Sequence, residues 1–298
     1  MIEPLPTAVT DIVAWIVIGL FLTGWALQGK GRYARSVTAV AWGIFGGFWL
    51  LLIPRFALVM KSPIETVLSI LAVPVCVYVG YLVWSGRESL FVLSRAVAIM
   101  GVVYLPFETI PLLRRTFIET VARQTLVVIG LLGSEATLTT GPEYGYQSAL
   151  VFTTDGHRYV THIVLACTGV GSMSIFAGLI AALDAPLTRK LRAASVAIAV
   201  IYVLNLLRNA FIAVAFGEQW FQILIGPVMA ITGYQDPGLV SFFIADRVIS
   251  QSASVLALVG ITWLVVRYLP ELLTVIEDLL FIVTREEYDL RDRMGKAS

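Results

Sequence analysis

Long apolar runs separated by short polar segments make up most of the chain. A helix needs about 20 mostly apolar residues to cross roughly 30 Å of hydrocarbon, and several runs reach that length. The pattern therefore predicts an all-α fold: a polytopic membrane helical bundle with about seven spans and a range of six to eight. The predicted spans are residues 11–28, 36–53, 64–84, 89–105, 163–183, 193–216 and 240–268.

Three further stretches do not fit a simple span. Residues 112–133 have a helical pattern but carry four charged side chains in their first half. If they crossed the membrane, the later helices would reverse against the distribution of basic loops, so we expect a helix lying at the outer interface. Residues 218–233 contain an internal Gly-Pro pair and predict an interfacial or re-entrant piece. From Glu271 onward the pattern predicts an amphipathic helix on the cytoplasmic surface.

Residues 134–162 differ from the rest of the chain because they are rich in Thr, Tyr and Gly. They contain the run SALVFTT, which is typical of a β-strand, followed by the turn signal Asp155-Gly156. We expect this segment to form a small extracytoplasmic cap on a single transmembrane domain that spans residues 1–298.

Basic residues in the short loops indicate the orientation of the bundle. Seven spans with the N-terminus outside place three basic clusters in the cytoplasm and the cap outside. Arg87 agrees with this orientation, whereas Arg55 and Lys61 disagree mildly. We therefore expect a multi-pass protein of the cell membrane. The three clusters are Lys30, Arg32 and Arg35; Arg189, Lys190 and Arg192; and Arg285, Arg291, Arg293 and Lys296.

Composition supports the membrane as solvent. Hydrophobic residues make up 58% of the chain and charged residues 14%, with a mean hydropathy of +0.86, whereas soluble domains carry about 25% charged residues. The net charge of +1 gives no support to a nucleic-acid partner. Two cysteines exclude a disulfide scaffold, and Cys76, in an apolar run, is expected to be a buried, inert thiol. Two histidines without ligand spacing predict neither a metal site nor a cofactor.

Three ionisable residues lie inside the predicted spans. Because it costs free energy to place an ionisable group in a membrane, their presence there calls for an explanation. Cys167, Arg208 and Arg247 lie at a similar predicted depth below the outer boundary, each in a successive span. Each alone has an ordinary explanation: the cysteine packs, and an arginine snorkels or pairs with a carboxylate such as Asp246. The shared depth, and Asn209 beside Arg208, favour a functional constellation.

The chemistry of these residue types is specific. A free thiol is only a few per cent thiolate at neutral pH, and a nearby guanidinium lowers its pKa. Arginine does not act as a general base but stabilises an oxyanion. His162 is a candidate acceptor for the Cys167 proton, although an exposed loop histidine is the plainer alternative. Thr168 and Gly169 are small enough to allow close approach of backbone or substrate.

Three sequence elements carry a family resemblance. The runs ACTGVGSMSIFAG around Cys167, LNLLRNAFI around Arg208 and ADRVIS around Arg247 resemble the archaeosortase/exosortase family. The resemblance covers about residues 64–268. Exosortases usually have His in the third position, so Arg247 indicates the archaeosortase branch.

The resemblance implies a membrane cysteine transpeptidase of archaeal type. Cys167 would be the nucleophile, Arg208 would stabilise the thiolate or oxyanion, and Arg247 would take the third triad position. Substrates would be exported proteins, such as an S-layer glycoprotein, with a C-terminal tripartite sorting tail headed by a Pro-Gly-Phe-type signature. A thioester acyl-enzyme would pass the new C-terminus to a lipid amine. Two alternatives stay open: a transporter or channel that uses the intramembrane arginines, and an intramembrane cysteine protease that releases its product by hydrolysis.

Overall fold

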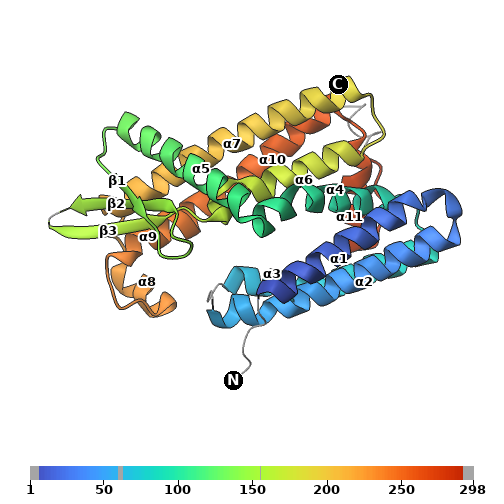
Figure 1. Cartoon of the computed structure of the whole chain (residues 1–298), viewed down its shortest axis with the longest axis horizontal. Helices are drawn as coiled ribbons and strands as arrows, with labels where there is room; N and C mark the ends of the chain where they lie inside the picture. The colour runs from blue at the N-terminus through green and yellow to red at the C-terminus, as the bar shows by residue number, and fades with distance from the viewer. Residues whose placement is uncertain (1–6, 60–62, 155, 291–298) are drawn as a thin grey trace. The chain divides into compact units, whose positions relative to one another are not determined.

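The computed structural model describes residues 7–59, 63–154 and 156–290, and these are mostly helical (Figure 1). The helices are α1 Thr7–Ala26, α2 Arg32–Pro54, α3 Pro63–Ser85, α4 Leu90–Thr109, α5 Pro111–Leu131, α6 Val170–Ala182, α7 Leu187–Gly217, α8 Ile225–Thr232, α9 Leu239–Phe243, α10 Gln251–Tyr268 and α11 Leu272–Thr284. The strands are β1 Thr137–Thr140, β2 Gln147–Thr154 and β3 His157–His162. Short 3₁₀ turns lie at Gln28–Lys30 and Leu165–Thr168, and π-helical turns at Arg55–Val59 and Ile244–Ser250.

The predicted fold class is confirmed. Within the described residues, six helices are long and apolar enough to cross a membrane, and each matches a predicted span. They are Val9–Ala26, Arg32–Val59, Ile64–Ser85, Leu90–Thr109, Leu187–Gly217 and Leu239–Tyr268.

The prediction of a span over residues 163–183 needs a correction. Strand β3 ends at His162, a 3₁₀ turn follows, and helix α6 begins only at Val170. Its 13 residues extend about 20 Å, which is short of the hydrocarbon thickness. The helix starts late because Gly169 has φ +77, a left-handed conformation that does not continue a right-handed helix.

The other helical predictions concern segments outside the six spans. Helix α5 confirms a helix over residues 112–133, and it begins with Pro111 at its first position, where the missing N–H costs nothing. Helix α8 lies within residues 218–233, and α11 follows Glu271. One face of α11 is buried through Leu272, Leu273 and Val275, as an amphipathic pattern requires. Lys61 and the basic residues of 291–298 lie outside the described residues.

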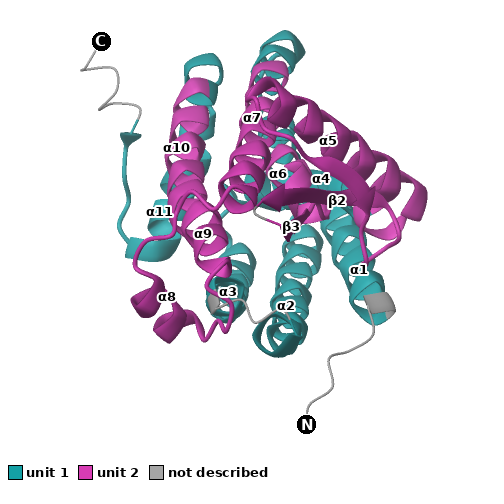
Figure 2. Cartoon of the chain, turned by 90° about the vertical axis from the view of Figure 1, so that its left-hand side faces the viewer, with its two compact units in different colours: residues 1–105, 174–194, 265–298 teal, residues 106–173, 195–264 magenta. Residues whose placement is uncertain are grey.

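Packing divides the chain into two compact units (Figure 2). Unit 1 comprises residues 1–105, 174–194 and 265–298, and unit 2 comprises residues 106–173 and 195–264. Each unit is assembled from segments that are distant in sequence. That residues 1–298 act as a single transmembrane domain stays a prediction.

Unit 1 is built on the packing of α1, α2 and α3, where small residues bring helices together. A Cβ on Gly80 would lie 3.1 Å from the carbonyl oxygen of Ala39, and one on Gly46 would lie 3.3 Å from the Cβ of Cys76. Close backbone approach of this kind is typical of membrane helix pairs. Cys76 is a buried free thiol, in line with its expected packing role.

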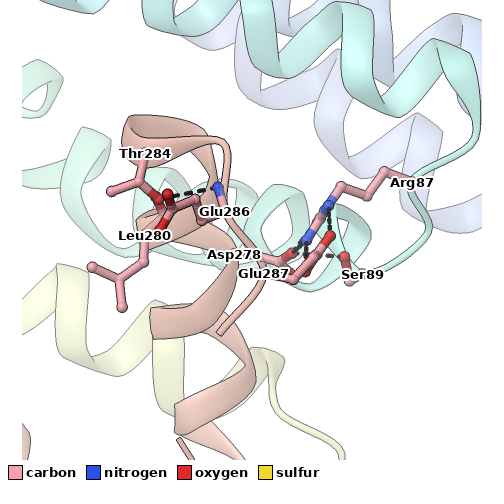
Figure 3. A network of polar contacts seen from close by, with 7 residues as sticks. All are labelled: Arg87, Ser89, Asp278, Leu280, Thr284, Glu286 and Glu287. Atoms are coloured by element: carbon pink, nitrogen blue, oxygen red, sulfur yellow. Dashed lines mark hydrogen bonds and ion pairs between the residues drawn. The ribbon is translucent and has the colours of Figure 1, made fainter. Parts of the chain in front are cut away.

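Unit 1 also holds the C-terminal helix through a polar cluster. Arg87, in the α3–α4 connection, contacts Asp278 of α11 and Glu287 beyond it, and Ser89 donates to the same Asp278 (Figure 3). These charged contacts attach the end of the described chain to the loop between two spanning helices.

Unit 2 contains a three-stranded antiparallel sheet in the order β1-β2-β3. The predicted strand is β2, with Ala149, Leu150, Val151 and Phe152 all buried. Helix α5 packs against this sheet, and Thr154 Oγ1 donates to the Gly217 carbonyl at the end of α7 at 2.8 Å. A two-residue connection joins β2 to β3, with Gly156 at φ +79; Asp155 lies outside the described residues.

Candidate active site

Cys167 lies in a 3₁₀ turn that links the sheet to helix α6, outside the six spanning helices. The Cys167 amide donates to the Val164 carbonyl at 2.8 Å. The buried hydroxyl of Thr168 donates to the Leu165 carbonyl at 2.6 Å and accepts from the Val170 amide at 3.4 Å. Thr168, predicted as a supporting residue, therefore closes the turn that presents the cysteine and begins α6.

Two asparagines of α7 hold the backbone of this turn. Asn205 Nδ2 and Asn209 Nδ2 each donate to the Cys167 carbonyl at 2.7 Å. The two residues are four positions apart and share one face of the helix. A carbonyl oxygen has two lone pairs, so this pair of donors saturates it. The position of Cys167 is thus fixed to α7.

Gly169 is required for this contact. Its φ of +77 is strained for other residues, and a Cβ there would lie 3.1 Å from Cγ of Asn205. Glycine therefore lets the turn reverse and lets α7 approach at the same point. The sequence interpretation of Gly169 as a residue that permits close approach agrees with this geometry.

Arg208 lies on the same helix and forms an ion pair with Asp246. Its Nη2 lies 2.5 Å from Asp246 Oδ1. Arg247 lies beside the other oxygen of the same carboxylate, with Nε 3.5 Å from Oδ2. One carboxylate is thus shared by two guanidinium groups, and α7 carries both the asparagines that hold Cys167 and the arginine that binds Asp246.

Asp246 and Arg247 occupy a π-helical turn, Ile244–Ser250, inside the long helical span Leu239–Tyr268. Such turns insert an extra residue and occur often at functional sites. The Asp246 side chain is 15% exposed, whereas those of Arg208 and Arg247 are 30% and 44% exposed. The carboxylate is therefore the covered centre of the cluster, and the guanidinium groups retain accessible surface.

The thiol of Cys167 contacts the backbone of His162 rather than its imidazole. Sγ lies 4.0 Å from the His162 carbonyl oxygen, to which the S–H donates. The His162 residue is exposed at the end of β3. The predicted proton acceptor is therefore close in the chain, but the contact that the structure shows is made by its main chain.

Burial raises the pKa of the Cys167 thiol above its ordinary value, and the carboxylates of Asp246 and Glu143 act in the same direction. A backbone hydrogen bond from Val164 and the positive charge of Arg208 lower the pKa but do not outweigh burial. That Arg208 stabilises the thiolate in catalysis stays a prediction. The resting thiol is protonated at neutral pH.

Sequence reasoning does not find two contacts of the candidate site, those of Asp246 with both arginines and of Asn205 with the Cys167 carbonyl. The sequence indicates Asp246 only as an ordinary partner for an arginine, and it does not single out Asn205. The i, i+4 spacing of Asn205 and Asn209 on an apolar helix was a readable signal for one shared partner. Within the described residues, no group of three or more His, Cys, Asp or Glu side chains could hold a metal ion.

A family model described as transmembrane exosortase matches residues 9–234, which include Cys167 and Arg208 and end before Arg247. The chain belongs to the archaeosortase/exosortase family. It is 51% identical over 302 aligned positions to Archaeosortase A of Haloferax volcanii, covering 98% of this chain and 99% of the relative. It is 48% identical over 284 positions to Archaeosortase A of Natronomonas pharaonis, covering 92% of this chain and 89% of the relative. No solved structure matches.

The predicted family, and the resemblance to archaeosortase A within it, are confirmed by these relatives. The chain is accordingly a multi-pass membrane protein of this family. The residues that would serve its chemistry remain those assembled in unit 2.

Proposed function

We propose that this protein is a membrane cysteine transpeptidase that processes the C-terminal sorting tails of exported proteins. The observation that carries the proposal is the double hydrogen bond from Asn205 and Asn209 to the Cys167 carbonyl. It attaches the thiol-bearing turn to the helix that carries Arg208. A cysteine used only for packing has no need of such an attachment.

In the proposed reaction, Cys167 Sγ attacks the carbonyl carbon of the scissile peptide bond and forms a C–S bond. Arg208 stabilises the oxyanion of the tetrahedral intermediate, as a fixed donor does in other acyl-transfer sites. Collapse breaks the C–N bond, and the thiol proton ends on the departing amine of the tail. The product is a thioester on Cys167.

A lipid amine then attacks the thioester and forms an amide. The amine gives up one proton, which returns to the Cys167 sulfur. This step anchors the mature protein, such as an S-layer glycoprotein, in the membrane. Hydrolysis by water would give a free carboxylate instead, and it is the alternative outcome for the same acyl-enzyme.

Because the pKa of the Cys167 thiol is raised, we propose that Arg208 also stabilises the thiolate. Since burial favours the protonated thiol, the guanidinium must favour the negative charge that develops on sulfur as the reaction begins. Arg247 holds the opposite oxygen of Asp246 and so orients the carboxylate that orients Arg208. We assign Arg247, the third triad residue, this positioning role.

The proposed orientation puts the site at the extracytoplasmic face. It rests on the basic loop of residues 29–35, which favours the cytoplasm and is separated along the chain from Cys167 by three helices long enough to span, α2, α3 and α4. Exported substrates reach that face without crossing the membrane again.

The decisive experiment compares Cys167→Ala and Cys167→Ser with a matched Cys76→Ala control in lipid vesicles. The probe is a purified precursor with a Pro-Gly-Phe-type signature, an apolar helix and a basic end. We expect both Cys167 variants to lose processing by at least about 10³-fold, and Cys76→Ala to process normally. Processing at the wild-type rate by Cys167→Ala would refute the proposal.

Mass spectrometry of the processed C-terminus separates the two fates of the thioester. An added lipid mass supports transfer. A free carboxylate in the presence of lipid amine would instead identify a hydrolase.

A further inference from the structure

Strand β3 forms one edge of the sheet (Figure 1). Cys167 follows five residues after the strand ends at His162. Its register with β2 pairs Thr154 with His157 at the hairpin, and the Ile163 amide donates to the Ser148 carbonyl at 2.8 Å. In an antiparallel pair, residues alternate between those that bond the neighbouring strand and those whose N–H and C=O point away. The bonded pairs at both ends of β3 therefore fix the direction of every residue between them.

Arg158, Val160 and His162 are the residues whose main-chain groups point away from β2. One of these outward main-chain groups already contacts the proposed nucleophile. The carbonyl of His162 accepts the S–H of Cys167 at 4.0 Å. The row of outward main-chain groups thus ends at the proposed nucleophile.

We propose that the extended substrate segment beside the scissile bond adds to β3 as a fourth strand, and that this pairing delivers the scissile carbonyl to Cys167. The inference rests on the proposed function. An extended peptide fits an edge strand because its own alternating N–H and C=O groups match those of the edge. The side chains of the edge residues leave room for it: Arg158 and His162 are exposed, and Val160 is half-buried.

The opposite edge strand of the sheet, β1, serves as a control for β3. Strand β1 pairs with the other side of β2, and its outward-pointing groups include those of Leu138. Two strand spacings, roughly 10 Å, separate this edge from β3. It has the same chemistry but does not lead to the cysteine.

The first test removes one outward N–H from each edge. Proline is tolerated on an edge strand where its nitrogen faces away from the sheet, so Val160→Pro and Leu138→Pro are matched variants. With the precursor described above, we expect Val160→Pro to lower kcat/KM by about tenfold or more, mainly through KM. Leu138→Pro should stay within about threefold of wild type, because it removes no β3 donor.

A structural readout accompanies these assays. Alkylation of Cys167 by iodoacetamide at alkaline pH, in a Cys76→Ala background, reports whether the turn still presents the thiol. We expect unchanged alkylation in Val160→Pro. Normal processing by that variant would overturn strand addition and leave the role of Cys167 untouched, whereas processing by Cys167→Ala would refute the proposed function itself.

The second test leaves the protein unmodified, which covers the case in which Val160→Pro fails to fold. Precursor peptides are methylated at one backbone nitrogen at a time through the residues beside the scissile bond. We expect losses of about tenfold at alternate positions and small losses between them, because only every second N–H of an added strand faces β3. Losses without this alternation would overturn the proposal.

Discussion

Each unit contains a cluster of arginine and carboxylate side chains, and the two clusters differ in how many carboxylates contact each arginine. In unit 1, Arg87 donates from Nε to Asp278 at 3.0 Å and from Nη1 to Glu287 at 2.8 Å. Its guanidinium carbon also lies 3.7 Å from the ring centroid of Phe281. Two carboxylates and an aromatic ring thus surround one arginine, which contributes to holding α11 in place.

In unit 2 two arginines share one carboxylate: among the described residues, Arg208 and Arg247 both form an ion pair with Asp246. Within the described contacts, Arg208 donates from Nη2, which leaves Nε and Nη1 for another acceptor. A guanidinium whose donors are all occupied can support a fold but has nothing to offer an oxyanion. We therefore expect the number of unoccupied donors, rather than the presence of an ion pair, to distinguish the proposed catalytic arginine from a structural one.

The same substitution in both clusters, arginine to glutamine, tests this distinction, and Arg208→Gln should have the largest effect of any variant outside Cys167. We expect Arg208→Gln to lower kcat by about 10²–10³-fold, the usual loss for one oxyanion donor. It should also shift the pH profile of kcat/KM to higher pH, because the charge of Arg208 lowers the pKa of the Cys167 thiol. Arg208→Lys keeps the charge without the planar fork, so full activity there would disprove the oxyanion role.

Arg87→Gln is the matched variant in the other cluster. It leaves Asp278, whose side chain is 5% exposed, without its ionic partner, and we expect a loss of about 1–3 kcal/mol in the free energy of unfolding. Thermal unfolding in detergent micelles measures this loss. Activity per folded molecule should stay within about twofold of wild type, and a catalytic defect as large as that of Arg208→Gln would erase the distinction between the clusters.

A single substitution at Gly169 can displace the turn that holds Cys167. Gly169→Ala forces an L residue into φ +77 and places a Cβ 3.1 Å from Asn205 Cγ, so the turn must shift away from α7. We expect a loss of about tenfold in kcat/KM, because small displacements of a reacting atom are costly. Gly171→Ala is the control, since a Cβ there meets nothing within 4 Å; equal losses in both variants would contradict the proposed attachment.

Local sequence patterns predicted much of this architecture. Hydropathy located the six long helices, since a run of about 20 apolar residues has few alternatives to a span. The same pattern failed at residues 163–183, because the start of α6 depends on Gly169 and on the pairing of β3 with β2. Those contacts link distant residues, and no local periodicity records them.

The candidate site shows the same division. Cys167, Arg208 and Arg247 could be selected because polar groups in apolar runs are costly. Asp246 contacts both arginines, and it lies in a π-helical turn that the sequence pattern does not predict. Asn209 binds the Cys167 carbonyl instead of supporting Arg208, because α7 packs against the turn that contains Cys167. Such details depend on tertiary packing, which cannot be predicted from the pattern of neighbouring residues.

The smallest expected effect concerns Glu287, at the exposed rim of the Arg87 cluster. Its hydrogen bond with Arg87 lowers the pKa of this carboxyl, so folding favours the charged form. The contribution to stability is present above the ordinary glutamate pKa of about 4.3 and is lost as the pH falls through the lowered value of the folded state. We expect wild type to have a slightly higher unfolding temperature than Glu287→Gln at pH 7, and the difference to vanish in strong acid. Since exposed ion pairs contribute little, a difference at pH 7 that rivals that of Arg87→Gln would mean that Glu287, rather than the covered Asp278, is the main partner of Arg87.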